Sequence, residues 1–137
     1  MSSETGPAAA QRMLDYDQAS AALGMELVEL GVGRAVVRMR LTGRMVNGHG
    51  IAHGGYVFLL ADTAFACACN SHGPVAVASG ADITFVASGR EGDLLVAAAE
   101  ERTTFGRNGI YDVTVRRDDL DGPVIAEFRG RSRIMGS

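Results

Sequence analysis

The chain has 137 residues, of which 47% are hydrophobic and 21% are charged, a balance typical of one globular domain. Its net charge of -3, with acidic and basic residues interspersed, excludes a surface built to bind the phosphates of nucleic acid. The start of the chain has no positive region followed by an apolar run, so we expect no secretory signal and predict a cytoplasmic protein.

The first part of the chain predicts a helix followed by a β-hairpin. Residues 1–8 are expected to be a flexible N-terminus, and residues 9–23 are rich in Ala, Gln, Met and Leu, as in a short helix. Met25–Leu30 and Arg34–Leu41 alternate in hydrophobicity and are joined by a Gly-Val-Gly turn, which is typical of a hairpin. The arginines of the second strand mark its solvent-exposed face.

A second helix is predicted from Gly54 to Ser71. This segment is nearly continuous in Ala, Leu and Phe, and Asp62 is its only charged residue. The uncharged stretches beside Asp62 are shorter than the ~20 apolar residues that a membrane-spanning helix needs, so no membrane association is expected. A helix that is apolar on nearly all sides must be covered on nearly all sides.

The C-terminal half predicts strands that supply this cover. The segments between the strands, such as Glu91-Gly92-Asp93 and Arg107-Asn108-Gly109, are typical of turns that join neighbouring antiparallel strands. We therefore predict an α+β fold in which a curled antiparallel sheet wraps around the buried helix. Six strands leave one face of the helix open, and a second copy of the chain is the expected cover. The predicted strands are Val75–Val86, Leu94–Phe105, Ile110–Arg116 and Val124–Ile134.

Asp62 is the first candidate for a functional side chain. Burying an unpaired carboxylate costs several kcal/mol unless hydrogen bonds or a raised pKa relieve it. Either Asp62 faces solvent through a gap in the cover of the helix, or it serves a reaction.

The loop before the helix supports the second interpretation. It runs from Asn47 to Gly55 and is rich in glycines, which let a backbone approach a ligand closely. The first amides of a helix have no partner within it and lie at the positive end of its dipole, so the Gly54 or Gly55 N–H can stabilise an oxyanion. Asn47 can add a second donor or hold a water. An Asn-Gly pair alone is commonly a turn, and a Gly-Gly pair commonly serves packing; only the combination with Asp62 is informative.

Helix geometry then separates Gly55 from Asp62. Seven residues place them on the same helix face but ~10 Å apart along the axis. An attacking group must lie ~3 to 3.5 Å from the carbonyl carbon, so Asp62 does not reach a carbonyl held by Gly55 of its own chain. Two antiparallel helices across a two-fold axis would bring Asp62 of one chain to Gly55 of the other. We therefore expect a homodimer with shared active sites.

The pattern N-x-x-G-x-x-H-G-G, followed by L-A-D-T-A-F-A-x-A-C-N-S, resembles the PaaI-type acyl-CoA thioesterases of phenylacetic acid degradation. The similarity extends in order and length over nearly the whole chain. It implies a single hotdog thioesterase domain over residues 1–137, a dimer with a continuous sheet, and further pairing into a homotetramer. The implied reaction is hydrolysis of aryl-acyl-CoA thioesters of the phenylacetyl type, without a cofactor.

The resemblance also assigns roles to the motif residues. Asp62 corresponds to the catalytic carboxylate, which attacks the thioester carbonyl or activates a water. Gly54 corresponds to the glycine whose amide polarises that carbonyl, and Gly55 is its neighbour. Asn47 corresponds to the asparagine that contacts the carbonyl or orients the water. His53 corresponds to the histidine before the glycines, for which a helix-entry role and a direct role both remain open.

Substrate-binding positions lie further along the chain. Ser79, and after it Thr84, are candidates on the strand that follows the helix. Arg107 and Asn108 lie in the turn where the resemblance places the nucleotide end of CoA, although a solvated turn charge is the ordinary interpretation of Arg107. Relatives commonly have Arg-Pro where this chain has Ala87-Ser88, which removes a phosphate contact expected there.

Other functions fit the sequence less well. A hotdog enoyl-CoA hydratase would have an N-P-x-H segment, which is missing. A non-catalytic acyl-CoA sensor or a structural subunit has no need of Asp62, and a thioesterase for medium-chain aliphatic acyl-CoA remains an alternative to the aryl-acyl reaction. His49 and His53 lack a third ligand, so no metal is expected. Cys67 and Cys69 point in different directions on a helix and are expected to be buried hydrophobic residues.

Overall fold

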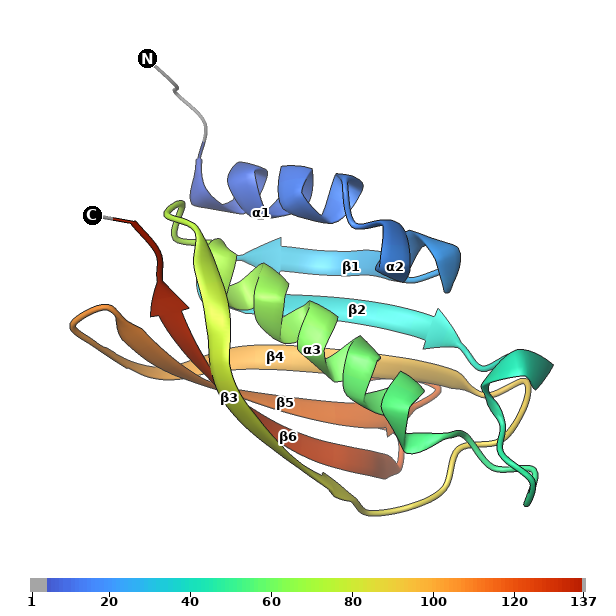
Figure 1. Cartoon of the computed structure of the whole chain (residues 1–137). Coiled ribbons are helices and arrows are strands. Elements are labelled where there is room, and N and C mark those ends of the chain that lie inside the picture. Colours follow the sequence, from blue (N-terminus) through green and yellow to red (C-terminus); the bar gives the residue numbers. More distant parts are fainter. Residues whose placement is uncertain (1–4, 137) are drawn as a thin grey trace.

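The structure is a computed structural model that describes residues 5–136. Its sheet has six strands. The sheet is curled and wraps around one long helix, α3 (Gly54–Asn70), as Figure 1 shows. The predicted α+β architecture is therefore confirmed. The elements are α1 (Gly6–Asp15), α2 (Gln18–Ala22), β1 (Glu26–Gly31), β2 (Arg34–Arg40), η1 (Gly43–Met45), α3 (Gly54–Asn70), β3 (Ala76–Phe85), β4 (Leu94–Phe105), β5 (Asn108–Arg117) and β6 (Val124–Ile134).

The strand order is β1-β2-β4-β5-β6-β3, with every neighbouring pair antiparallel. The predicted β1–β2 hairpin is confirmed, but the expected pairing of β3 with β4 is wrong. β3 pairs instead with β6, where Asp82 lies opposite Arg129, and β4 lies beside β2. The reason is that residues 86–93 form a long connection, fixed where the Ala52 N–H donates to the Gly89 carbonyl at 2.8 Å.

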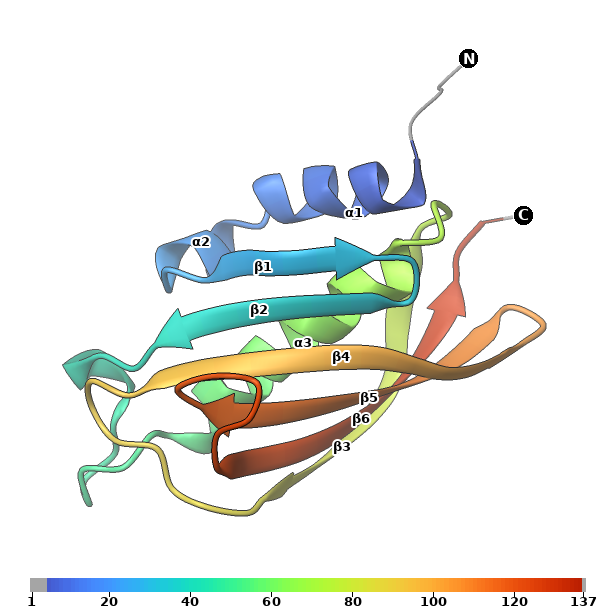
Figure 2. The same ribbon diagram turned by 180° about the vertical axis from the view of Figure 1, so that it is seen from behind.

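The concave face of the sheet packs on α3. In β2, Ala35, Val37 and Met39 are buried toward the helix, and Arg34, Arg38 and Arg40 are exposed, as predicted. Val36, on the same face as the arginines, is buried as well. Figure 2, seen from behind, shows β2, β4, β5 and β6 covering the back of the helix. The strands thus supply the apolar environment that the helix sequence requires.

Gly130 of β6 lets the sheet approach α3 closely. A Cβ atom at this position would lie 2.8 Å from ring atoms of Phe65, so a larger residue would displace that ring. Phe65 is buried and packs against Tyr111 and Phe128, with ring centroids 5.6 and 5.8 Å apart. Phe65 is therefore a core residue and does not line a substrate pocket.

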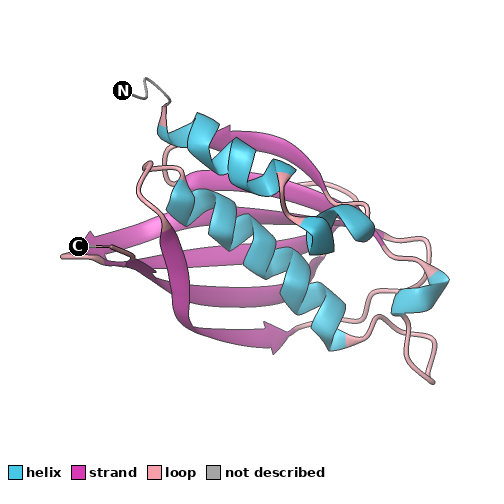
Figure 3. Cartoon of the chain, turned by 45° about the horizontal axis from the view of Figure 1, so that its top comes forward, coloured by secondary structure: helices cyan, strands magenta, loops and turns pink. Residues whose placement is uncertain are grey.

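The N-terminal helical segment differs from the prediction. Instead of one helix over residues 9–23, α1 begins at Gly6 and a separate α2 follows after a break at Tyr16 and Asp17. The Asp17 side chain caps α2 by accepting a hydrogen bond from the Ser20 N–H, which composition alone does not reveal. Residues 6–8 of the predicted flexible N-terminus are helical, and residues 1–4 lie outside the described part of the chain. Figure 3 shows both short helices lying beside α3 on one side of the sheet.

One edge of the sheet and one side of α3 are left open in the single chain. β3 is an edge strand, and its Val77 and Phe85 side chains are 44% and 52% exposed. On α3, a stripe of residues at helical spacing is only partly covered: Gly55, Leu59, Asp62 and Ala66. Within residues 5–136, no helix has the length and apolar character needed to cross a membrane.

Candidate active site at the open side of α3

His53 begins α3 as its N-cap residue. Its backbone is extended, and its Nδ1 atom accepts a 3.2 Å hydrogen bond from the Gly55 N–H. This bond satisfies one of the amides that the first turn of a helix leaves without a partner. His53 therefore has the helix-entry role that the sequence left open, while its side chain stays exposed at the mouth of the site.

The two glycines after His53 differ in what their amides can do. The Gly55 N–H is bonded to His53, whereas the Gly54 N–H has no acceptor among residues 5–136. The ring of Phe85 covers Gly54, since a Cβ atom there would lie 2.8 Å from Cζ of that ring. A ligand oxygen at the positive end of α3 would thus find the Gly54 N–H as its donor.

Asn47 shapes the loop that leads into α3. Its Oδ1 atom accepts hydrogen bonds from the N–H groups of His49, at 2.8 Å, and Ile51, at 3.4 Å. The Asn47 N–H in turn donates to the Ile51 carbonyl at 2.8 Å, which closes the loop. The side-chain oxygen is therefore occupied, and the amide NH₂ group, which has no acceptor within the described residues, is left for a ligand.

Asp62 lies in the middle of α3, on the partly covered stripe. Its side chain is half-buried, and no hydrogen bond to its carboxylate is found within residues 5–136. Burial raises the pKa of Asp62 above its usual value, and the negative charge of Asp17 raises it further. A carboxyl with a raised pKa that still reaches the surface suits a base or a nucleophile.

Within one chain, Asp62 and the Gly54 amide do not meet. α3 is continuous from Gly54 to Asn70, so eight residues of helix separate the two, which is ~12 Å along the axis. One chain therefore supplies an oxyanion donor and a carboxylate at two separate points along α3.

The predicted substrate-binding residues of β3 lie away from this point. Ser79 is exposed at a bulge, and its Oγ atom donates to the Arg131 carbonyl at 3.2 Å. Thr84 lines a shallow hollow with Asp112, Glu127 and Arg129 on the convex face of the sheet. Phe85, the next residue, points to the helix instead, so the Thr84 side chain and Gly54 lie on opposite faces of the sheet.

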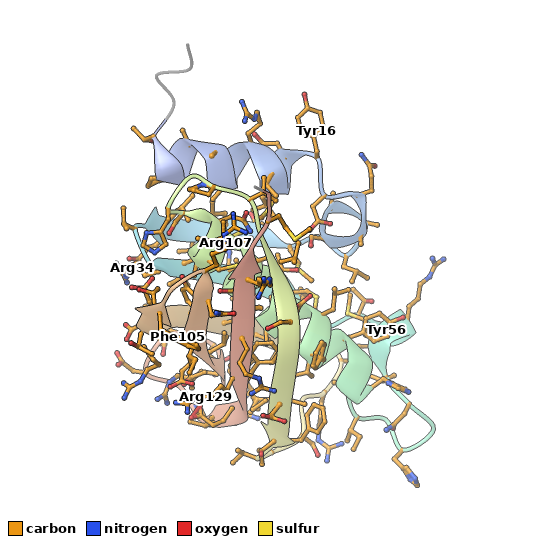
Figure 4. The ribbon with its side chains drawn as sticks, turned by 60° about the vertical axis from the view of Figure 1, so that its left-hand side comes forward. Tyr16, Arg34, Tyr56, Phe105, Arg107 and Arg129 are labelled. Atoms are coloured by element: carbon orange, nitrogen blue, oxygen red, sulfur yellow. The ribbon has the colours of Figure 1, made fainter. Side chains whose placement is uncertain are left out.

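Arg107 and Asn108 lie at the other end of the molecule. They line a hollow of about 270 Å³ with Cys69 and His72, near the C-terminal end of α3. Figure 4 shows Arg107 near the end of β6, well apart from Tyr56 in the first turns of α3. The Arg107 side chain is exposed, as expected for a charge that meets a ligand or solvent.

A second hollow, of about 620 Å³, lies beside the first turns of α3. It is lined by Tyr56 and by residues of the α2–β1 turn and η1, including Leu23, Arg44 and Met45. Met45 also accepts the backbone hydrogen bond of His53, which places this hollow next to the N-terminus of α3. Of the three aromatic residues on α3, Phe65 is buried and Phe58 packs on Phe128, with ring centroids 5.3 Å apart, whereas Tyr56 lines this hollow.

Neither a metal site nor a reactive cysteine is found in the part of the chain that the structure describes. No group of three or more His, Cys, Asp or Glu side chains is placed to hold a metal ion there. Cys67 and Cys69 are free and buried, and burial raises the pKa of each thiol to about 12. No sequence pattern marks Asp17, whose charge acts on Asp62 although the two are far apart in the chain.

Known proteins resemble this chain in sequence and in fold. A family model described as the thioesterase superfamily matches residues 49–123, which include Asp62 and the glycines before it. The acyl-coenzyme A thioesterase PaaI of Escherichia coli is 42% identical over 93% of this chain and 89% of its own length. The structure of the E. coli PaaI protein has a TM-score of 0.91, with 41% identity over 96% of this chain and 94% of that one.

Two further solved structures extend the comparison. An asparagine-to-aspartate variant of the phenylacetic acid degradation protein PaaI from Thermus thermophilus is 34% identical, with a TM-score of 0.82 over 87% of this chain and 100% of that one. A Streptococcus mutans protein, solved with bound acetyl CoA, is 26% identical, with a TM-score of 0.77 over 82% of this chain and 90% of that one.

The fold, the site and these matches define the class, which is a thioester hydrolase with the hotdog fold. The chain belongs to the thioesterase superfamily and is of the PaaI type.

Proposed function

We propose that the protein hydrolyses acyl-CoA thioesters to a free acid and CoA, with Asp62 as the catalytic carboxylate. The observation that carries this proposal is the half-buried Asp62 carboxyl, whose pKa is raised by burial, on the same helix as the Gly54 amide, which has no acceptor within residues 5–136. Two relatives support CoA as the thiol: one is named an acyl-coenzyme A thioesterase, and another was solved with acetyl CoA.

The chemistry follows from these groups. The Gly54 N–H donates to the thioester carbonyl oxygen and stabilises the negative charge that develops there. Asp62 either takes a proton from a water as the water attacks the carbonyl carbon, or attacks that carbon itself to form a mixed anhydride that water then cleaves. In both routes the C–S bond breaks, the electron pair leaves on sulfur and the CoA thiolate takes up a proton. Asn47 orients the water or the carbonyl through its free amide group.

Because Asp62 and Gly54 of one chain are too far apart to act on the same carbonyl, each active site needs residues from two chains. We propose a homodimer in which β3 edges pair into a continuous sheet and the two α3 helices lie antiparallel. Asp62 of one chain then faces Gly54, His53 and Asn47 of the other. The exposed apolar side chains of β3 support this arrangement, because a long unpaired apolar edge is rarely left open. Further pairing of dimers into a homotetramer is part of the same proposal.

For the acyl group we propose an aryl-acetyl chain of the phenylacetyl type. The hollow beside Tyr56 offers an aromatic wall next to the carbonyl site, and two relatives of the PaaI type are named for phenylacetic acid degradation. Arg107 and Asn108 are proposed to bind the nucleotide end of CoA, and Ser79 of β3 to contact substrate across the dimer. The Thr84 side chain, on the convex face of the sheet, is not part of the proposed site. A cytoplasmic location fits this substrate.

Release of free CoA thiol from a panel of thioesters tests the proposal. The panel contains phenylacetyl-CoA, a ring-hydroxylated phenylacetyl-CoA, and aliphatic acyl-CoA esters of medium chain length. We expect the aryl-acetyl esters to have the highest kcat/KM. A higher kcat/KM for the medium-chain esters would show that the substrate is an aliphatic acyl-CoA and not an aryl-acetyl-CoA. Binding of the esters without release of thiol would show that the protein is a non-catalytic acyl-CoA sensor.

A further inference from the structure

A chain of hydrogen bonds joins the N-terminal helices to α3 directly beside Asp62. Asp17 accepts two hydrogen bonds from Ser20, one from its N–H at 2.9 Å and one from its hydroxyl at 2.7 Å. The Ser20 Oγ atom lies 2.9 Å from Oγ1 of Thr63, the residue that follows Asp62. Because Ser20 has one hydroxyl proton and donates it to Asp17, Thr63 is the donor to Ser20.

This chain of bonds is closed off from solvent. Ser20 is 1% exposed and Thr63 is 4% exposed, so water does not replace either partner. A buried hydroxyl that loses its partner costs ~1 to 3 kcal/mol, which makes the contact a fixed point between α2 and α3. Figure 3 shows the short helices running alongside α3, in the position that this contact requires.

Asp17 also acts on Asp62 through its charge. Burial raises the pKa of Asp62 most, and the carboxylate of Asp17 raises it further. The strands present apolar side chains to α3, and the nearby thiols of Cys67 and Cys69 are neutral at physiological pH because their pKa is about 12. Tyr111 of β5 donates its hydroxyl to Glu101, and its pKa is raised as well, so it carries no charge there. Among the described residues, Asp17 is thus the charged group that acts on Asp62.

Asp17 stabilises α2 as its N-cap, but its negative charge opposes ionisation of Asp62, so the cap alone does not account for its effect on Asp62. We propose that Asp17 is a positioning residue for thioester hydrolysis, which fixes the segment that carries Asp62 through Ser20 and Thr63 and whose negative charge acts on the Asp62 carboxylate. The proposal rests on the catalytic role proposed for Asp62. A stronger base takes a proton from water more readily, or attacks a carbonyl faster, once it is ionised.

Asp17→Asn tests the charge while keeping the cap. Asparagine is as good an N-cap as aspartate and still accepts from the Ser20 N–H. Asp15→Asn is the matched control, because it removes the same charge from an exposed residue at the end of α1. Asp62 is titrated directly by ¹³C NMR of its carboxyl carbon, with the signal identified by its loss in Asp62→Asn. The acid limb of kcat/KM is measured on the same proteins.

In Asp17→Asn we expect the midpoint of the Asp62 NMR titration and the acid limb of kcat/KM to move to lower pH, and kcat/KM on the pH plateau to fall severalfold. In Asp15→Asn we expect neither the titration midpoint nor the acid limb to move. An unmoved NMR titration in Asp17→Asn overturns the proposal whatever the rates are. An NMR shift without a shift of the acid limb overturns it as well, and shows in addition that Asp62 is not the base. If Asp17→Asn does not fold by circular dichroism, Asp17→Ser, which also caps, takes its place.

Ser20→Ala tests the hydrogen-bonded link separately. It leaves the charge of Asp17 in place but removes the hydroxyl that connects Asp17 to Thr63. We expect kcat to fall severalfold while the NMR titration of Asp62 stays at higher pH than in Asp17→Asn. A wild-type kcat in Ser20→Ala would overturn the positioning part of the proposal.

Discussion

The Nδ1 atom of His53 accepts the hydrogen bond of the Gly55 N–H, 3.2 Å away, and thereby leaves the Gly54 N–H as the free amide of the first turn. The cap thus selects which of two adjacent glycines can meet a thioester carbonyl. It also makes the side chain of His53 part of the helix rather than a freely moving acid or base.

Two substitutions separate these roles of His53. Removal of the cap in His53→Ala is expected to lower the free energy of unfolding by ~1 kcal/mol and to reduce kcat, because the first turn frays. Asparagine is a strongly preferred cap, so His53→Asn should retain most of the stability and most of the activity. Urea unfolding and thiol release measure both. A stable but inactive His53→Asn would show that the imidazole itself takes part in the reaction.

Asp62→Asn should reduce kcat by roughly 10²- to 10⁴-fold, because it removes the proposed base or nucleophile without changing shape. The dimer should persist in light scattering. Thiol release at the wild-type rate in this variant would exclude the proposed mechanism.

The same variant should be more stable than the wild type at neutral pH. The folded-state pKa of Asp62 is raised, so its contribution to stability is fully present below the usual aspartate pKa of about 3.9 and is lost as pH rises through the folded value. Asparagine, which never ionises, avoids that loss. Thermal unfolding at several pH values should therefore show a higher Tm for Asp62→Asn near pH 7 and equal Tm values near pH 3.

Mixed dimers test whether the site is shared. Asn47→Asp keeps the oxygens that close the loop but replaces the amide donor, so we expect it to be nearly inactive. Refolding it at equal amounts with Asp62→Asn gives dimers in which one of two shared sites has neither defect. Random pairing then predicts about a quarter of the wild-type activity. If each site lay within one chain, every site would carry a defect and the mixture would stay inactive.

Cys67 and Cys69 should be unreactive in the native protein. Both thiols are buried, their pKa is about 12, and the thiolate is the reactive form. Ellman's reagent is therefore expected to modify neither within minutes at pH 8, but both after unfolding in guanidinium. Fast native labelling would indicate opening of α3. Slow labelling also means that the protein's own thiols add no background to a thiol-release assay.

The sequence predicted most elements of the fold because their patterns are local. The alternation of β2 and the apolar run of α3 are each visible within one segment. The predicted pairing of β3 with β4 was wrong because Glu91-Gly92-Asp93 has the composition of a hairpin turn. The connection between β3 and β4 is instead fixed by distant residues such as Ala52, and β3 pairs with β6. Tertiary contacts of this kind leave no mark in the composition of a turn.

The residues of the candidate site also divide into those that a local sequence pattern reveals and those that only tertiary contacts reveal. Asp62 stands out because it is the one charge in an apolar helix, and the glycines before it stand out by their density. Asp17 has no such signal: it follows an ordinary helix, and its relation to Asp62 exists only after α2 has packed on α3. Groups that act through space on a reactive residue are therefore the ones that a local pattern misses.

The pairing of β3 with β6 has a consequence for synthesis on the ribosome. β3 follows α3 directly in the chain, yet its hydrogen-bonding partner, β6, leaves the ribosome only after β4 and β5. Until β6 emerges, the apolar helix has only part of its cover and β3 has two open edges, both of which favour aggregation. Such long-range pairing also slows folding. Loss of the last ten residues should thus yield insoluble protein, even though every proposed active-site residue is still present.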